Sequence, residues 1–260
     1  MEKIEHTYSS RISYALSLIK ETHILFHELA KNKNINEIYN EVINDNLFDK
    51  TALQSRKKAF SAIKNRFYSN PRVNNKILIK IIESNLDDSI KNQVLYYYFS
   101  KSESIVYDIT TKLLYKIFLE GKLIISKDDI LNFLKSQTKT HKEIDKWTES
   151  TQEHIVQHYL AIMKDFGFLK GRQKKQFNVP FIPIEIIVFI IFEKLEMKNN
   201  IKQILNSDDF KLFFLDKDDL IHYLEEGAKM GYFRFNYTKD IYDLNSMGMT
   251  LEAFVDAITR

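Results

Sequence analysis

Two pairs of histidines have a spacing that could bind a metal ion. Each pair lies four residues apart, so a helix would place both rings on one face: His23 with His27, and His154 with His158. A zinc site needs a third ligand, and neither pair carries the glutamate of an HExxH motif. The chain has no cysteine, so thiolate ligands and disulfide bonds are excluded. We therefore expect surface or interface histidines, and neither a metal nor another cofactor.

Neighbouring carboxylates are the other candidates for chemistry. Pairs of aspartates occur near four expected helix starts: Asp87 and Asp88, Asp128 and Asp129, Asp208 and Asp209, Asp218 and Asp219. Adjacent residues point in different directions on a helix, and a carboxylate near a helix N-terminus is stabilised there. Helix capping therefore explains the pairs better than acid–base catalysis. The six glycines form no phosphate-binding loop and no serine lies in G-x-S-x-G, so the sequence predicts no enzyme.

Basic residues gather where they could neutralise phosphates. Residues 50–82 hold nine lysines and arginines and no acidic residue, although the net charge of the chain is only +3. Residues 205–260 are acidic instead, with 11 acidic against 6 basic side chains. Affinity for a nucleic-acid duplex comes mainly from such cations. From the first block we predict these phosphate contacts: Arg56, Lys57, Lys58, Lys64, Arg66, Arg72, Lys76 and Lys80.

The elements that must hold these residues are nearly all helices. Gly and Pro are rare, and hydrophobic residues make up 44% of the chain and recur at helical spacing. We predict helices over 16–29, 35–42, 53–67, 77–81, 88–98, 104–120, 126–134, 150–166 and 218–229. Leu53 is placed in the apolar stripe of its helix, with Lys57 and Lys64 beside it. The apolar stretch 179–195 contains prolines and charges, which indicates a buried helix and no membrane span.

The order of elements after residue 104 is typical of a winged helix-turn-helix. A helix is followed by a β-like run at 123–125, a second helix, a long helix opened by a capping-box pattern at 150–153, and a hairpin at 168–179. The hairpin tip would be a basic wing with Lys170, Arg172, Lys174 and Lys175. The long helix would offer Gln152, His154, Gln157 and Lys164 to a duplex, which favours phosphate and shape contacts over strong sequence recognition.

The fold class predicted is therefore mainly α: a helical bundle with a winged-helix-like unit and small β-hairpins. We divide the chain into an N-terminal bundle with basic helices (1–103), the winged-helix-like unit (104–183) and a C-terminal helical and hairpin region packed on the rest (184–260). Strands are expected only near 123–125, 168–179 and 232–244. Trp147 and Phe166 should be buried and brace the two ends of the long helix.

Five short motifs resemble those of a known family. They are Ser17-Leu18 with Glu21-Thr22, VINDNL at 42–47, IKNRF at 63–67, KWTEST at 146–151 and DFGFL at 165–169, with Pro180 soon after. Their order and spacing resemble the BrxA accessory proteins of BREX phage-exclusion systems, over at least Ser17 to Pro183. None of the motifs is catalytic. The positions that match the family pattern are Asn46, Leu47, Arg66, Trp147 and Thr151.

The resemblance implies a cytoplasmic, helical, non-enzymatic protein that binds double-stranded DNA and acts with other BREX components in phage defence, away from membranes. It also implies similarity to an antitermination-factor helical bundle. Two alternatives remain open. The protein could be a scaffold of the defence complex, with the acidic tail and the tyrosines at 96–98 as partner surfaces, or an RNA-binding bundle of antitermination-factor type.

Overall fold

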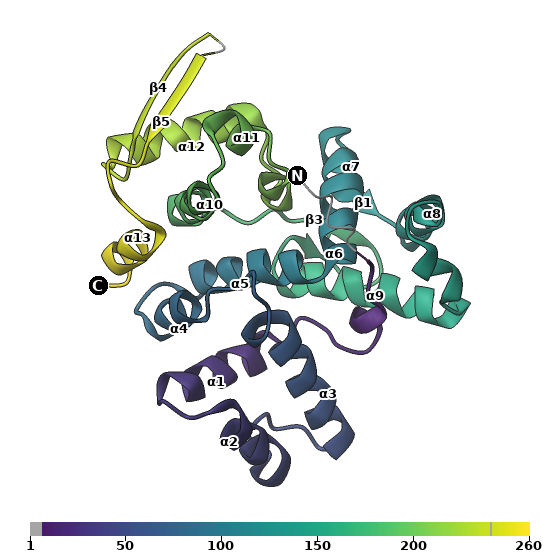
Figure 1. Cartoon of the computed structure of the whole chain (residues 1–260). Helices are drawn as coiled ribbons and strands as arrows, with labels where there is room; N and C mark the ends of the chain where they lie inside the picture. Colours follow the sequence, from purple (N-terminus) through teal and green to yellow (C-terminus); the bar gives the residue numbers. More distant parts are fainter. Residues whose placement is uncertain (1–6, 240) are drawn as a thin grey trace.

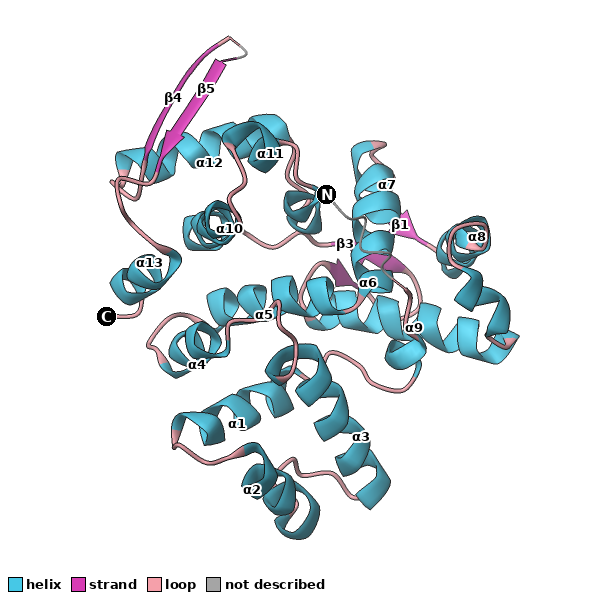
Figure 2. Ribbon diagram, viewed as in Figure 1, coloured by secondary structure: helices cyan, strands magenta, loops and turns pink. Residues whose placement is uncertain are grey.

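The computed structural model describes residues 7–239 and 241–260 (Figure 1). Most of these residues lie in helices, and the described strands form two small antiparallel sheets (Figure 2). The predicted mainly α fold with small hairpins is confirmed. The strands also lie where the sequence places them.

The N-terminal part contains α1 (Ile19–Ala30), α2 (Ile35–Asn40), α3 (Leu53–Ile63), α4 (Asn75–Glu83) and α5 (Asp88–Ser102). Single π-helical turns, Glu41–Asp45 and Lys64–Tyr68, extend α2 and α3 to the ends that the sequence predicts. Asn46 stops the first extension in the left-handed conformation, with φ of 59°, which an asparagine tolerates better than most residues. α1 packs against α2, α3 and α4.

The middle part begins with a rod made of α6 (Ser104–Asp108), a π-helical segment (Ile109–Leu114) and α7 (Tyr115–Leu119). It continues with β1 (Ile124–Ile125), α8 (Lys127–Gln137), α9 (Glu149–Asp165), β2 (Leu169–Lys170) and β3 (Lys175–Phe177). β3 is the central strand, because it pairs antiparallel with both β1 and β2. A short strand between two helices is thereby joined to the later hairpin.

The start of α9 differs from the prediction. Thr148, and not Ser150, is the N-cap: its side chain accepts the Thr151 N–H at 3.2 Å. Both positions carry hydroxyl residues that could cap, so local sequence does not choose between them. Trp147, just before this cap, is only half-buried against the core, so the prediction of a buried tryptophan was wrong. Phe166 at the other end is buried, as predicted.

The C-terminal part consists of α10 (Ile184–Glu196), α11 (Ile201–Leu205), α12 (Lys217–Lys229), β4 (Arg234–Thr238), β5 (Ile241–Asn245) and α13 (Leu251–Ile258). α10 is buried from Ile186 to Lys194 and packs against α5, α12 and α13. Among the described residues, no helix is both long and apolar enough to cross a bilayer. The β4–β5 hairpin projects from α12 at the top of Figure 1.

Buried side chains form one hydrophobic cluster through all of these helices. Tyr96, Tyr97 and Tyr98 are all within it, each at most 1% exposed. Their neighbours come from both sides of α5, because Tyr96 packs against Phe168 and Phe213 while Tyr98 packs against Phe189. The suggestion that the tyrosines form a partner surface was therefore wrong.

Candidate nucleic-acid interface

α3 and its π-helical extension present one continuous polar face. Lys57, Lys58 and Lys64 lie on it, together with Ser61 and Asn65, and all of them are exposed or half-exposed. The opposite face is buried through Ala59, Phe60, Ala62 and Ile63. Leu53 is 48% exposed and so does not belong to the apolar stripe, contrary to the prediction. We call Lys57, Lys58 and Lys64 the α3 surface.

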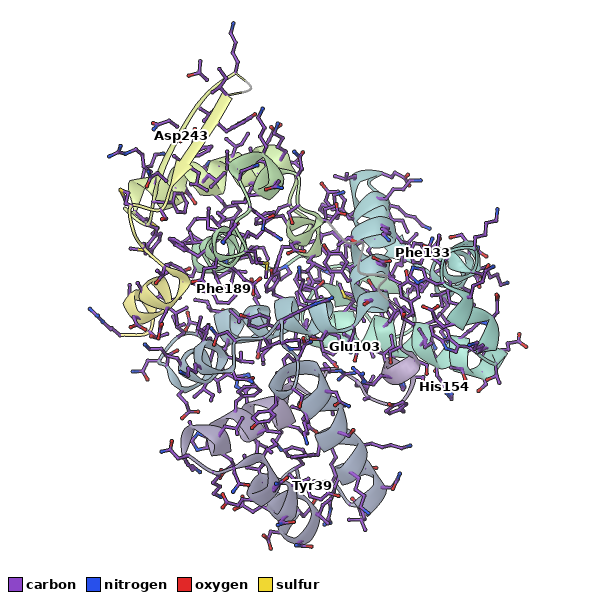
Figure 3. All side chains as sticks on the ribbon, viewed as in Figure 1. Tyr39, Glu103, Phe133, His154, Phe189 and Asp243 are labelled. Carbon is purple, nitrogen blue, oxygen red and sulfur yellow. The ribbon has the colours of Figure 1, made fainter. Side chains whose placement is uncertain are left out.

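Arg66 is the clearest correction to the predicted contacts. Its side chain is completely buried, and its Nε donates to Oε1 of the equally buried Glu103 at 2.7 Å. Its two Nη groups donate to the carbonyl oxygens of Leu16 and Ala15, and the guanidinium lies 4.6 Å from the centre of the Phe99 ring. Glu103 lies near the middle of the molecule (Figure 3). Arg66 therefore stabilises the core and does not reach a phosphate.

Two further arginines of the basic block are engaged with the backbone. Arg56 is half-buried and donates to the carbonyl oxygens of Lys50 and Ile43, both at 2.8 Å, which joins α3 to the preceding loop. Arg72 is half-buried and donates to the carbonyl oxygen of Lys101 at 3.2 Å. Neither is as exposed to solvent as Lys57 and Lys58 are.

The lysines of α4 do not join the α3 surface. Lys76 is exposed on α4, and Lys80, one turn later, forms an ion pair with Asp256 of α13. α1 packs against both α3 and α4, which lie on either side of it in Figure 1. The single cluster of six cations expected from the sequence is therefore not formed.

The predicted wing is an exposed basic hairpin. Lys170, Arg172 and Lys174 are exposed, whereas Lys175 is half-buried and donates to the carbonyl oxygen of Gly171 at 3.0 Å. Burial, and then the positive charge of Lys164 on α9, lower the pKa of Lys175. The C-terminal end of α9 and the hairpin thus bring cations together. We call Lys164, Lys170, Arg172 and Lys174 the wing surface.

One flank of α9 is covered by residues 8–18, which we call the N-terminal strap. His158 donates through Nδ1 to the carbonyl oxygen of Ile12 at 2.7 Å, and Ser17 donates to Asp165 at 2.6 Å. Of the side chains predicted to face a duplex, His154, Gln157 and Lys164 remain exposed. Gln152 is half-buried and donates to the carbonyl oxygen of Trp147.

The strap connects the α3 surface to the wing surface. Lys58 lies 5.6 Å from the centre of the Tyr14 ring, which belongs to the strap. Three residues later the strap bonds to Asp165, the carboxylate whose charge acts on Lys175 at the base of the wing. The strap therefore contacts α3 through Tyr14 and the C-terminal end of α9, which precedes the wing, through Ser17.

The histidines of the two pairs contact other side chains, the backbone or each other. His23 contacts Asn92 at 3.0 Å and His27 contacts Glu83 at 2.9 Å, while the rings of His154 and His158 stack on each other. No group of three or more metal-ligating side chains occurs within residues 7–239 and 241–260.

Sequence reasoning missed a buried polar cluster around Asp209. Helix capping is the role that the sequence predicts for Asp208 and Asp209, but Asp209 is only 2% exposed. It accepts hydrogen bonds from Lys101, Tyr97 and Tyr107, and it pairs with Lys194. The signal in the sequence was a lysine within the apolar run of α10, because a buried lysine needs a carboxylate partner.

Comparison with known proteins relates most of the chain to one family. The BrxA family model matches residues 6–194. A protein named BREX protein BrxA, from Bacillus cereus (strain H3081.97), is 22% identical over 182 residues, which cover 67% of this chain and 88% of that protein. The crystal structure of an uncharacterized protein from Magnetospirillum magneticum has a TM-score of 0.62 at 14% identity, over 79% of this chain and 97% of that one. This last likeness concerns the fold alone.

Proposed function

The chain belongs to the BrxA family, and from this premise we propose that it is an accessory protein of a BREX phage-defence system that binds double-stranded DNA and catalyses no reaction. The relative from Bacillus cereus carries the name of a BREX protein, which supports the place in that system. We further propose that the protein works in the cytoplasm with other BREX components.

The observation that carries the DNA-binding proposal is the presence of two exposed basic surfaces, one on α3 and one on the wing. Lys57 and Lys58 on α3, and Lys170, Arg172 and Lys174 on the wing, are all exposed. Cations on a folded surface bind a duplex by releasing the counterions that surround its phosphates. These exposed cations are the only groups that the DNA-binding proposal requires.

We interpret the middle part as a winged helix that contacts phosphates more than bases. The interpretation is supported by the order α7, β1, α8, α9, β2, β3 and by the pairing of β1 with β3. In such a unit α9 would be the helix that enters the major groove. The strap occupies one flank of α9, and no arginine lies on its exposed face. Phosphate contacts fix position but carry no sequence information.

The test is a fluorescence anisotropy titration of labelled duplex DNA, duplex RNA and single strands at several salt concentrations. One variant replaces Lys57, Lys58 and Lys64 with Glu, and a second replaces Lys170, Arg172 and Lys174 with Glu. A control with the same change in charge replaces three exposed lysines of the C-terminal part: Lys198, Lys202 and Lys229.

We expect tight, salt-dependent binding to duplex DNA that both test variants weaken and the control retains. Equal losses in all three variants would mean that only the total charge matters. Tighter binding to duplex RNA would favour the RNA-binding alternative. Binding that is absent even at low salt would reject the proposal.

A scaffold function is the second candidate, and the β4–β5 hairpin favours it. The hairpin projects from α12, Ile241 is 76% exposed and Tyr237 is 44% exposed. Exposed apolar side chains on a projecting hairpin are suited to a protein partner. Replacing Ile241 and Tyr237 with Ser would weaken assembly with other BREX components under this alternative and leave DNA binding unchanged.

A further inference from the structure

The strap presents two large side chains to solvent. Tyr14 is 52% exposed and Leu16 is 37% exposed. The residues that alternate with them, Ala15 and Ser17, are buried. Single exposed apolar side chains are common on protein surfaces, but the backbone that carries this pair is fixed by buried groups.

Two arginines hold this part of the strap. Arg66, which is completely buried, donates to the carbonyl oxygens of Ala15 and Leu16, the first at 2.8 Å. The backbone N–H of Tyr14 donates to the carbonyl oxygen of Arg11 at 3.1 Å. The side chain of Arg11 reaches the same buried carboxylate that pairs with Arg66. A segment that is already ordered loses little conformational entropy when it binds a partner.

The ring of Tyr14 lies beside the α3 surface. Nζ of Lys58 is 5.6 Å from the centre of the ring, and both Lys57 and Lys58 are exposed. If these lysines contact phosphates, the bases of the bound nucleic acid come close to Tyr14. Bases inside an intact duplex are stacked on each other and closed to a side chain. A base at a gap is unpaired, and every base has a face on which an aromatic ring can stack.

We propose that Tyr14 stacks on an unpaired base at an interruption of a DNA duplex, with Leu16 as an apolar contact beside it. This inference rests on the proposed binding of double-stranded DNA and adds to it a preference for interrupted duplexes. The α3 lysines fix the position of the duplex through its phosphates. The ring then supplies a contact that an intact duplex does not offer. Apolar side chains placed at an opened base step are one way in which proteins recognise deformed DNA.

The experiment compares an intact labelled duplex with the same duplex carrying a one-nucleotide gap, by fluorescence anisotropy with the full chain. We expect the gapped duplex to bind at least about fivefold more tightly, which is the lower end of what stacking of one base on an aromatic side chain contributes. Salt dependence should be the same for both duplexes, because the phosphate contacts are shared.

A photochemical crosslink locates the contact directly. The unpaired base opposite the gap is replaced by 5-iodouracil, which on irradiation crosslinks to an aromatic ring that stacks on it. We expect the crosslink in the tryptic peptide 12–20, in which Tyr14 is the one aromatic residue. This measurement uses the wild-type protein, so it does not depend on the folding of any variant.

Three variants separate stacking from phosphate contacts. Tyr14→Ala should bind the gapped and the intact duplex equally, with an unchanged salt dependence. Tyr14→Phe should keep the preference for the gap, because the ring and not the hydroxyl group makes the contact. Tyr237→Ala is the matched control, since it removes a ring of β4 that is 44% exposed, and it should behave like the wild type. Circular dichroism of each variant shows whether the fold is retained.

Equal affinity of the wild type for the two duplexes would overturn this proposal while leaving duplex binding in place. So would a gap preference that folded Tyr14→Ala keeps or that folded Tyr237→Ala loses, and so would a crosslink outside residues 12–20. Absence of binding to both duplexes would reject the proposed function together with this inference.

Discussion

At the scale of single residues, helical spacing predicts which lysines face solvent but not which arginine is drawn inside. The apolar residues of α3 place Lys57 and Lys58 on the open side. The position of Arg66 depends on Glu103, which is 37 residues away, and on two carbonyl oxygens of the strap. A basic residue within a basic block carries no local sign of such distant partners.

Arg66→Met should destabilise the protein by about 3 kcal/mol, because the buried Glu103 would lose its buried guanidinium partner and keep only the half-buried Arg11, 3.2 Å away, as a cation. Urea unfolding followed by circular dichroism measures this cost. The double variant Arg66→Met with Glu103→Leu should recover part of the stability, since both buried charges are then removed. If Arg66→Met were as stable as the wild type, Arg66 would not be a core residue.

The carboxyl group of Asp209 predicts how stability depends on pH. Burial alone would raise its pKa, but the Lys101 and Lys194 ammonium groups outweigh burial and hold the pKa well below the usual range. A carboxyl with a lowered folded pKa contributes stability above its unfolded pKa of about 3.9. The contribution is lost as the pH falls from there through the folded pKa.

Asp209→Asn should therefore cost about 3 kcal/mol near neutral pH, because the buried Lys194 and the half-buried Lys101 lose the carboxylate that they share. The difference from the wild type should shrink as the pH falls below about 4. Unfolding in urea at a series of pH values measures both quantities. A difference that stays constant from neutral to acid pH would show that the ionised carboxylate is not what stabilises the cluster.

At the scale of elements, the sequence predicts helix and strand positions well because their end signals are local. Ser126 caps α8 in a capping box with Asp129, and the glycines at 121, 167 and 231 follow helix ends with positive φ. The prediction fails where two signals compete, as at Thr148 and Ser150. It also fails where a segment that is distant in the sequence packs on an element, as the strap packs on α9.

The turn of the wing supplies a test at this scale. Gly171 has φ of +97°, and a Cβ there would lie 2.2 Å from the carbonyl oxygen of Lys174. Gly171→Ala should therefore distort the tip that carries Arg172 and Lys174. We expect duplex binding to weaken by about three- to tenfold, within roughly 1.4 kcal/mol, with little change in the melting temperature.

The matched control for this variant is Gly121→Ala. Gly121 also has a positive φ, but nothing lies within 4 Å of the added Cβ and the residue is outside the wing. Its backbone strain should affect stability and leave DNA affinity unchanged. An equal loss of affinity in the two variants would show that the shape of the wing does not determine DNA binding.

At the scale of the whole molecule, contacts between distant segments decide what the basic residues can do. Lys80 meets Asp256 across 176 positions, and the strap brings residues 8–18 onto α9. Composition shows that the chain has a basic block and an acidic end. It does not show that Asp256 of α13 forms an ion pair with Lys80 of that block. The Asp209 cluster is likewise assembled from segments that no local pattern joins.

At this scale we predict that one duplex contacts both basic surfaces at once. The slope of log affinity against log salt falls by about 0.9 for each phosphate contact that is lost. Replacing the three lysines of the α3 surface should lower the slope by up to about 2.7. Replacing Lys170, Arg172 and Lys174 of the wing surface should lower it by the same amount. If a single duplex spans both, the variant with all six replaced should lose the sum of the two slope changes.

Measurement of the three slopes on the same short duplex distinguishes this from two independent sites. With independent sites, replacing one surface leaves the slope of the other site intact, and the combined variant alone loses salt dependence. The control at Lys198, Lys202 and Lys229 should keep the wild-type slope, because these lysines lie on α11, on α12 and in the turn after α10. Unchanged slopes in both single-surface variants would therefore contradict a shared interface even if the affinity fell.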